Sequence, residues 1–219
     1  MDYRKEIGED MKILFTGFEP FNGRDINPSQ KILENIKAPE NIELIKKILP
    51  VEFDATTQIL EELVEKERPD IILSLGQAGN VPNIAVERVA INMDNCRSSD
   101  GIKELPDSAG VTYVDRPIIK DGPDAYFATL PVWNLVKAVN KEDILCRASY
   151  SAGTYVCNHV MYVCCHLATK YKNMRTGFVH VPFLPEQMPK GMPGFSMEFS
   201  DMLKGVQIII DYLAGEIND

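Results

Sequence analysis

A cysteine at a predicted helix start and a histidine at a predicted strand end are the residues best suited to chemistry. Cys157 lies in residues 153–159 (GTYVCNH), between a strand-like run and an apolar, helix-like one, so its thiol is expected in the first turn of a helix. Partial positive charge and free N–H groups at a helix start favour the thiolate. His180, in residues 177–182 (GFVHVP), ends another strand, and a sheet could return it to that thiol. A thiolate with a nearby imidazole points to acyl transfer, most simply amide hydrolysis.

The five Cys of the chain do not have equal claims to reactivity. Most free Cys are small buried hydrophobes. Cys164 and Cys165 in the middle of a predicted helix, and Cys146 in a predicted strand, fit that description. Cys96 lies in a polar segment and is unassigned. For Cys157, the residues alone leave the nucleophile and the buried hydrophobe equally open.

The chain has only three His, which simplifies the search for a base. His159 is two residues after Cys157, and side chains two apart on a helix do not face each other. His166 lies in the middle of an apolar helix and is expected to be structural. His180 is therefore the best candidate base. A metal site made of Cys157, His159 and His166 is an alternative, but it lacks the paired short spacings and the fourth ligand of zinc sites.

Glu87 is a carboxylate in a predicted strand with apolar neighbours. Buried charges are costly unless they are paired. One candidate partner is Arg88, although adjacent strand residues point to opposite faces. The other is an imidazole, which the carboxylate would orient and keep basic. Arg97 and Asp100 lie in the polar segment beyond, where ordinary solvated charges are the simplest interpretation.

Two aromatic side chains flank a proline in a loop expected after the first strand. Phe18 and Phe21 lie on either side of Pro20. Such a pair either plugs the core or offers a stacking surface to a flat ligand. The residues alone favour neither interpretation.

The elements that must position these residues alternate along the chain. Strands are expected at residues 11–16, 42–49, 71–75, 84–93, 144–149 and 176–181, and helices at 28–36, 55–66, 132–139, 155–171 and 199–213. Alternation of this kind predicts an α/β protein with a mostly parallel sheet and helices on both faces. Residues 94–123, rich in Ser, Asp, Gly and Pro, are expected to form an excursion with a short hairpin.

In such sheets, ligands bind beyond the carboxyl ends of the strands. Phe18, Phe21, Gln77, Cys157 and His180 each follow or close a predicted strand. The topology therefore predicts that they converge at one edge of the sheet, independently of any motif.

Length and composition fit an enzyme. The 219 residues are 45% hydrophobic and 25% charged, which suits one globular domain at 11–219. Residues 1–10 are charged and are expected to form an N-terminal extension rather than a secretory signal. The net charge of −9 argues against nucleic acid or an anionic membrane as partners. An odd number of Cys, with no apolar run long enough to span a bilayer, predicts a soluble cytoplasmic protein.

The chemistry-bearing segments together resemble a known family, pyroglutamyl peptidase type I. Its members, also called pyrrolidone-carboxylate peptidases, are cysteine peptidases. The segments are residues 16–21 (TGFEPF), 76–79 (GQAG), 87–92 (ERVAIN), 153–159 (GTYVCNH) and 180–187 (HVPFLPEQ). Each is moderately specific, and their occurrence in this order is highly specific. The resemblance runs from about Met11 to the final helix.

The resemblance implies an activity and a catalytic set. The family removes N-terminal pyroglutamate from peptides without a metal or organic cofactor, through a thioester acyl-enzyme. By their place in the motifs, Cys157 would be the nucleophile, His180 the general base and acid, and Glu87 the carboxylate that orients the imidazole. Asp100 matches another acidic position considered for that last role, as an auxiliary acid. Arg97 matches an arginine near the oxyanion region.

The resemblance also implies a substrate pocket, a fold and an assembly. Phe18 and Phe21 would enclose the pyrrolidone ring, while Gln77, Tyr155 and Val156 would contact the substrate. The implied fold is a three-layer αβα sandwich akin to the purine nucleoside phosphorylases, and the implied assembly is a homotetramer.

Other functions remain open. A nucleoside phosphorylase or nucleosidase would share the architecture, but the sequence shows no Gly-rich phosphate loop, and fold alone does not decide function. A binding protein with Cys157 as a redox-sensing thiol would leave Glu87 and His180 unexplained. An inactive homologue is the remaining alternative.

Overall fold

A six-stranded sheet forms the middle layer of the molecule. The structure is a computed structural model that describes residues 10–79, 81–98, 101–188 and 194–215. In spatial order the strands are β2 (Ile42–Leu49), β1 (Met11–Phe18), β3 (Ile71–Gln77), β8 (Arg175–Val181), β4 (Ile84–Glu87) and β7 (Cys146–Ser149). Neighbours are parallel except for β4 and β8, which are antiparallel. The predicted mostly parallel α/β sheet is therefore confirmed.

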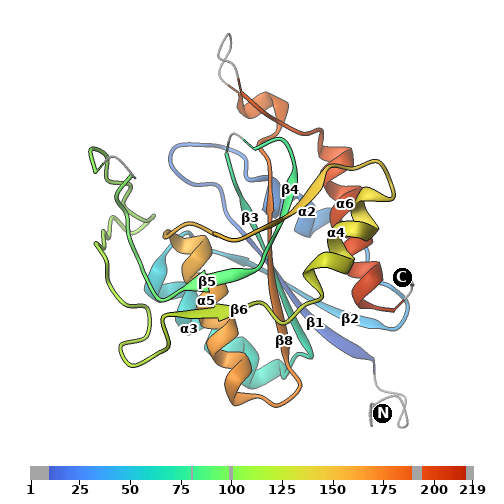
Figure 1. Ribbon diagram of the computed structural model, residues 1–219, viewed down its shortest axis with the longest axis horizontal. Coiled ribbons are helices and arrows are strands. Elements are labelled where there is room, and N and C mark those ends of the chain that lie inside the picture. The colour runs from blue at the N-terminus through green and yellow to red at the C-terminus, as the bar shows by residue number, and fades with distance from the viewer. Residues whose placement is uncertain (1–9, 80, 99–100, 189–193, 216–219) are drawn as a thin grey trace.

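Helices cover both faces of this sheet (Figure 1). One face carries α2 (Pro28–Asn35), α4 (Val132–Asn140) and α6 (Phe199–Leu213), and the other carries α3 (Phe53–Glu67) and α5 (Val156–Lys170). Beside α5 lies a two-stranded antiparallel sheet of β5 (Val89–Ile91) and β6 (Ala125–Phe127). A short 3-10 helix, η1 (Pro185–Gln187), follows β8. The result is the expected three-layer arrangement of helices, sheet and helices.

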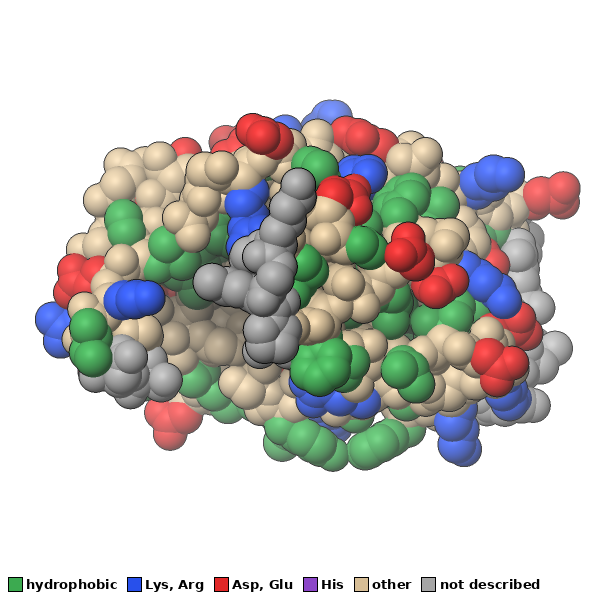
Figure 2. All heavy atoms as spheres, turned by 90° about the horizontal axis from the view of Figure 1, so that it is seen from above, with side chains coloured by type: hydrophobic (Ala, Val, Ile, Leu, Met, Phe, Trp, Pro, Cys, Tyr) green, Lys and Arg blue, Asp and Glu red, His purple; other side chains and the backbone are tan. Residues whose placement is uncertain are grey.

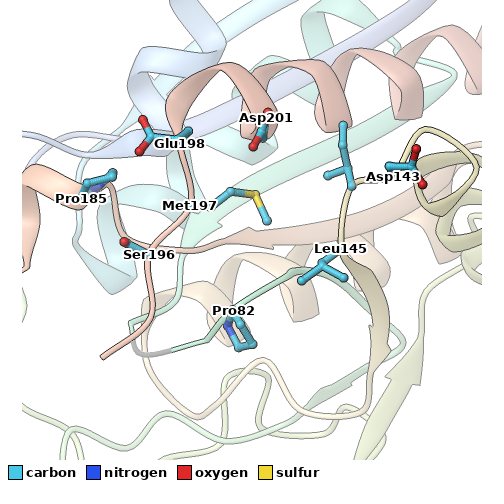
Figure 3. Close-up of a pocket in the computed structure, with 9 residues that line it drawn as sticks. Pro82, Asp143, Leu145, Pro185, Ser196, Met197, Glu198 and Asp201 are labelled. Atoms are coloured by element: carbon cyan, nitrogen blue, oxygen red, sulfur yellow. The ribbon is translucent and has the colours of Figure 1, made fainter. Parts of the chain in front are cut away.

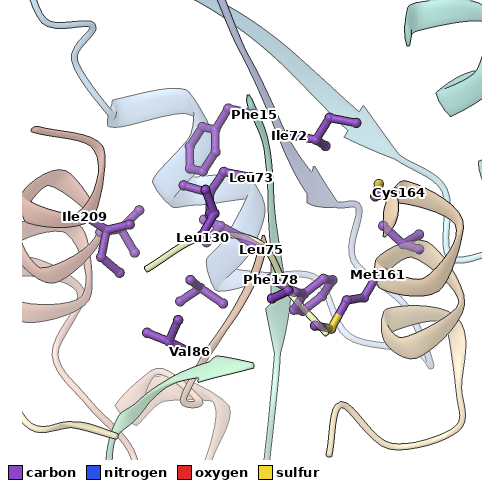
Figure 4. Close-up of a cluster of buried hydrophobic side chains, with 14 of the residues drawn as sticks. Phe15, Ile72, Leu73, Leu75, Val86, Leu130, Met161, Cys164, Phe178 and Ile209 are labelled. Atoms are coloured by element: carbon purple, nitrogen blue, oxygen red, sulfur yellow. The ribbon is translucent and has the colours of Figure 1, made fainter. Parts of the chain in front are cut away.

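The core occupies both faces of the central strands, which explains their unbroken apolar sequence. Because side chains alternate along a strand, Leu73 points toward Ile209 of α6, whereas Ile72 of the same strand points toward α5 (Figure 4). Phe178 of β8 lies against Met161 of α5 on that second face (Figure 4). All five side chains are almost fully buried. The helix that carries Cys157 is thus fixed against the strand that carries His180.

The single strand expected at residues 84–93 is two strands, which break at Arg88. The chain leaves the central sheet after Glu87, and Val89–Ile91 pairs with β6 instead. Arg88 marks the break: its backbone N–H donates to Ser149 O (2.7 Å), and its guanidinium lies over the Phe127 ring, 4.6 Å from the ring centre. In the excursion that follows, the described residues pair only at two isolated bridges, Asp94 with Arg116 and Arg97 with Glu104.

The loop between β1 and α2 is held by the cap of α2. The Asn27 side chain accepts from Ser29 N (3.0 Å) and donates to Glu19 O (2.9 Å), and Pro28 is the first helical residue, as the sequence predicted. The Ser29 hydroxyl in turn accepts from Phe18 N at 3.0 Å. These bonds fix the segment that carries Phe21.

The carboxyl ends of β1, β3 and β8 meet at one edge of the sheet, at the top of Figure 1. Cys157 reaches this edge in a different way from the one expected. β7 is parallel to β4 and therefore runs opposite to β8, so its carboxyl end does not lie at that edge. Residues 150–155 carry the chain back to the start of α5.

Among the described residues, no helix has both the length and the apolar character needed to cross a membrane. The expected extension at residues 1–10 falls, except for Asp10, outside the part of the chain that the structure describes.

Candidate active site

The structure brings Cys157, His180 and Glu87 together. His180 Nδ1 lies 2.8 Å from Glu87 Oε1, and both side chains are buried. A carboxylate can only accept, so Nδ1 carries the proton and donates. The other ring nitrogen remains available for Cys157, whose side chain interacts with the imidazole. Glu87 therefore has the imidazole as its partner, and Arg88 lies against Phe127 instead.

The charges around His180 favour its protonated form. Burial alone lowers the pKa of His180, but the charge of the Cys157 thiolate, its hydrogen bond and the Glu87 carboxylate outweigh burial and raise this pKa to about 10. The second Glu87 oxygen, Oε2, is buried with no hydrogen-bond partner among the described residues. A charge left in that position is costly unless a cation lies beside it. The surroundings of His180 thus favour an imidazolium at this position.

Cys157 differs from the other cysteines in its exposure. It is partly exposed, whereas Cys96, Cys146, Cys164 and Cys165 are buried. Burial raises the pKa of each of these four thiols, which keeps them protonated and unreactive. Of the five, Cys157 is the thiol that a ligand can reach.

The start of α5 offers free backbone donors beside the thiol. Cys157 is the second residue of the helix, and the residue before the helix, Tyr155, makes no side-chain cap to the first turn. The first N–H groups of a helix have no partner within it, and this first turn contains no acidic residue. Asn158 anchors the turn by bonding both Ile91 N and Ile91 O at 2.9 Å. Such N–H groups can stabilise a developing oxyanion.

Gly76 is where the backbone of β3 approaches the thiol. It pairs with His180 in the register of β3 and β8. A Cβ added at Gly76 would lie 2.8 Å from Cys157 Sγ and 2.8 Å from the Phe178 ring. Only glycine leaves room for the sulfur at this position.

We expect Gly76→Ala to reduce the rate at which Cys157 reacts by about 100-fold, because a displacement of the reacting group by roughly 1 Å has an effect of that size. The alkylation rate of Cys157 by iodoacetamide should change as well. Gly177→Ala is the matched control: the three atoms nearest to its added Cβ all belong to Leu130. It should lower the melting temperature but leave the alkylation rate alone. Equal alkylation rates for parent and Gly76→Ala would contradict the steric argument.

The remaining histidines are engaged elsewhere. His159 Nδ1 lies 2.9 Å from Asp94 Oδ1, and its Nε2 lies 2.7 Å from the Thr57 hydroxyl. Asp94 also pairs with Arg116 at 2.8 Å, so this buried network ties the excursion to α3 and α5. His166 Nδ1 lies 3.0 Å from the Tyr126 hydroxyl. Within the described ranges, no group of three or more His, Cys, Asp or Glu could hold a metal ion.

The two phenylalanines take different places. Phe18 is the last residue of β1 and is buried in the core, so its expected position in the loop is wrong. Phe21 lies in the loop, half-buried, with its ring centre 6.5 Å from that of Tyr155. The Tyr155 ring also meets Phe53 edge-on at 5.4 Å, and its hydroxyl donates to Pro106 O (2.9 Å). Phe21 and Tyr155 form an aromatic wall beside the start of α5.

Of the other residues expected to contact a substrate, some lie near the start of α5 or the end of β3 and others do not. Gln77 ends β3, and its Oε1 accepts from Gln187 Nε2 at 2.9 Å. Val156 is buried as the first residue of α5. Arg97 pairs with Glu104 at 3.1 Å, with both side chains about half exposed. Asp100 lies outside the described residues. Gln187 received no role from the sequence, although it belongs to one of the motifs that carried the resemblance.

A separate hollow lies at the start of α6. Its volume is about 360 Å³. The lining residues, drawn in Figure 3, are Pro82, Asp143, Ile144, Leu145, Pro185, Ser196, Met197, Glu198 and Asp201. None of the expected site residues is among them. On the face seen in Figure 2, Lys and Arg side chains are scattered among acidic ones rather than gathered in a patch.

The fold and the site together define a class of protein, the cysteine hydrolases. These enzymes use a reachable thiol, an imidazole and a carboxylate, and here all three are held by an α/β fold. The sequence model of one such family, pyroglutamyl peptidase, matches residues 11–216. The chain belongs to the pyroglutamyl peptidase family. The resemblance drawn from the motifs is thereby confirmed.

Individual relatives agree with this assignment over nearly their whole lengths. A pyrrolidone-carboxylate peptidase from Treponema denticola is 41% identical, over 95% of this chain and 96% of its own. One from Thermococcus onnurineus is 44% identical, over 91% and 97%. Among solved structures, a variant pyrrolidone carboxyl peptidase from Pyrococcus furiosus has a TM-score of 0.87 at 35% identity, covering 95% of this chain and 100% of that one. Pyroglutamyl peptidase I from Bacillus amyloliquefaciens has a TM-score of 0.86 at 34% identity, covering 94% and 95%.

Proposed function

We propose that this protein is a cysteine exopeptidase that removes N-terminal pyroglutamate from peptides through a thioester acyl-enzyme. The observation that carries the proposal is the buried His180–Glu87 pair beside the partly exposed Cys157 thiol. Membership of the pyroglutamyl peptidase family supplies the substrate class.

The first step is attack on the carbonyl that links pyroglutamate to the next residue. The Cys157 thiolate forms the new C–S bond, and the negative charge moves to the carbonyl oxygen. N–H groups in the first turn of α5 receive that oxyanion. Arg97 is left out of this step, because its guanidinium is paired with Glu104.

The second step releases the peptide and the third releases pyroglutamate. The His180 imidazolium protonates the leaving amine as the C–N bond breaks, which leaves a thioester on Cys157. The neutral imidazole then takes a proton from water, and the resulting hydroxide cleaves the thioester. Glu87 holds Nδ1–H throughout, which keeps the other ring nitrogen directed at the sulfur.

Recognition is assigned to the groups around Phe21 and Gln77. The wall formed by Phe21 and Tyr155 packs on the flat lactam ring, with Phe18 in the core behind it. Gln77 and the backbone of Val156 supply hydrogen bonds to the lactam. A proline ring has the same size but lacks the carbonyl, so it would leave a polar group of the pocket unpaired, which costs far more than a lost methylene.

The test compares a pyroglutamyl arylamide with the corresponding prolyl arylamide, in reducing buffer with a chelator. We expect kcat/KM to favour the pyroglutamyl substrate by about 10⁴-fold or more, the size found where a site's hydrogen-bonding groups lose their partner. Comparable turnover of the two substrates would refute the assigned specificity. No turnover of either would refute the peptidase function.

We further propose a cytoplasmic homotetramer. Five free thiols suit a reducing compartment. Several large apolar side chains are more than half exposed and would suit a contact between copies, namely Phe127, Trp133, Leu145, Tyr150 and Phe195. Sedimentation equilibrium would give the number of copies, and a monomer at micromolar concentration would rule the tetramer out.

A further inference from the structure

We propose that Gln187 sets the polarity of the substrate pocket: it fixes the Gln77 amide so that Gln77 presents N–H donors, which selects a ligand with a ring carbonyl. The inference rests on the proposed function, in which Gln77 contacts the lactam, and adds a specificity-determining residue behind it. Gln187 is a positioning residue, because it acts through Gln77.

The orientation of the Gln187 amide is determined by two backbone groups. Leu184 N–H donates to Gln187 Oε1 at 2.9 Å, and Gln187 Nε2 donates to Ile26 O at 3.0 Å. A backbone N–H can only donate and a backbone carbonyl can only accept. A flipped Gln187 amide would place donor against donor and acceptor against acceptor, so a single orientation is allowed.

That orientation is passed on to Gln77. The second hydrogen on Gln187 Nε2 donates to Gln77 Oε1 at 2.9 Å. Because Gln187 offers a donor here, Gln77 must turn its oxygen toward Gln187 and its nitrogen away. Among the residues that the structure describes, none accepts from Gln77 Nε2. Gln77 therefore keeps both N–H groups for a ligand.

We call the hydrogen bonds from Leu184 and Ile26 through Gln187 to Gln77 the relay. The backbone groups at its start are fixed by their own surroundings. Leu184 is fully buried. Ile26 precedes Asn27, the residue that caps α2 and fixes the loop of Phe21. Arg24 in the same loop donates to Gln187 O at 3.3 Å, and its guanidinium lies 4.5 Å from the centre of the Phe183 ring. The loop after β1 and the segment after β8 are joined through Gln187.

Gln77 lies next to the reacting groups, both along β3 and across to β8. Gln77 directly follows Gly76, whose backbone approaches Cys157 Sγ. Gln77 is also paired with Val181, the residue after His180. Gln77 therefore lies at the same edge of the sheet as Gly76 and His180, one residue further along its strand. A lactam carbonyl is the complementary acceptor, and the methylene in a proline ring is not.

The test replaces Gln187 by Glu. The carboxylate still accepts from Leu184 N, but it can donate neither to Ile26 O nor to Gln77, so the Gln77 amide turns its nitrogen toward residue 187 and its oxygen toward the ligand. We expect KM for the pyroglutamyl arylamide to rise by about 10- to 100-fold, the range for an unpaired buried polar group, with kcat nearly unchanged. A neutral ligand pair then reports the polarity of the pocket directly.

That pair is 2-pyrrolidone and pyrrolidine-2-thione, tested as competitive inhibitors. They have similar shapes and no charge, but sulfur is the weaker acceptor. The parent should bind the lactam more tightly, and Gln187→Glu should lose that preference. Gln187→Met, which neither donates nor accepts, is the second variant and should raise KM with an intermediate preference. Glu186→Gln, at an exposed neighbour paired with Lys31 at 3.6 Å, is the matched control and should behave as the parent.

The outcomes separate the relay from the function. A parent that turns over the pyroglutamyl arylamide, with Gln187 variants that keep its KM and its lactam preference, would overturn the relay and leave the function standing. A parent with no turnover would overturn both. A purely structural role for Gln187 would lower kcat and slow alkylation of Cys157, whereas the relay predicts unchanged alkylation in both variants.

Discussion

Replacing Cys157 by Ser is expected to reduce kcat on a pyroglutamyl arylamide by about 10⁴-fold or more, the scale seen when the nucleophile of a triad is removed. A serine hydroxyl beside His180 remains un-ionised and is a much poorer nucleophile than the thiolate. KM should change little, because the aromatic wall and Gln77 are not altered. Steady-state kinetics at matched concentrations of folded protein measures both quantities.

Cys164→Ala is the matched control for this substitution. Cys164 lies seven residues along the same helix and is buried, and burial raises the pKa of its thiol. Its loss should cost some stability through the small cavity left in the core, with kcat retained. A Cys157→Ser protein that kept substantial turnover would show that another group attacks the substrate.

Replacing Cys157 by Ala removes a charge from beside His180. Because the Cys157 thiolate and its hydrogen bond raise the pKa of His180, the imidazole in Cys157→Ala should titrate at lower pH than in the parent. NMR of the imidazole carbon and nitrogen would follow this titration. The loss of the thiolate and the shift in the imidazole are two consequences of one interaction.

The fold could be predicted from the sequence wherever a segment has a long, regular pattern. The strand Ile42–Leu49 and the helix Phe199–Leu213 were predicted with the bounds that the structure shows. The break at Arg88 could not be predicted, because it depends on contacts with Phe127 and Ala128, some forty residues away. The three-residue strand β6 is too short to carry a pattern of its own.

The site could be predicted where the chemistry lies in the residue type. Cys157 and His180 were indicated by their positions at the ends of predicted elements, and Glu87 by its apolar neighbours within a predicted strand. Gln187 gave no such signal, since a glutamine after a strand is ordinarily a solvated side chain. Its partners Ile26 and Gln77 are 161 and 110 residues away. Only the folded chain places them together.

Glu87→Gln is expected to lower kcat/KM by about 10²- to 10⁴-fold, the upper value being the effect of the corresponding change in a Ser-His-Asp triad. The amide keeps the shape of the carboxylate but removes its charge. It can also turn its NH₂ group toward His180 Nδ1, which would force the proton to the other ring nitrogen and disrupt the contact with Cys157. Among the residues that the structure describes, none bonds to Glu87 Oε2, so no neighbour on that side favours one orientation of the amide.

The same variant should shift the alkaline limb of the pH profile. In the parent, the pKa of His180 is raised to about 10, so the imidazolium that protonates the leaving amine persists through neutral pH and is lost only as the pH rises through that value. Without the Glu87 charge the imidazolium is less stable, so activity should be lost at lower pH. The kcat/KM profile of the free enzyme reports this limb. An unchanged limb in Glu87→Gln would mean that Glu87 orients the imidazole without supporting its charge, whereas Glu186→Gln should match the parent in either case.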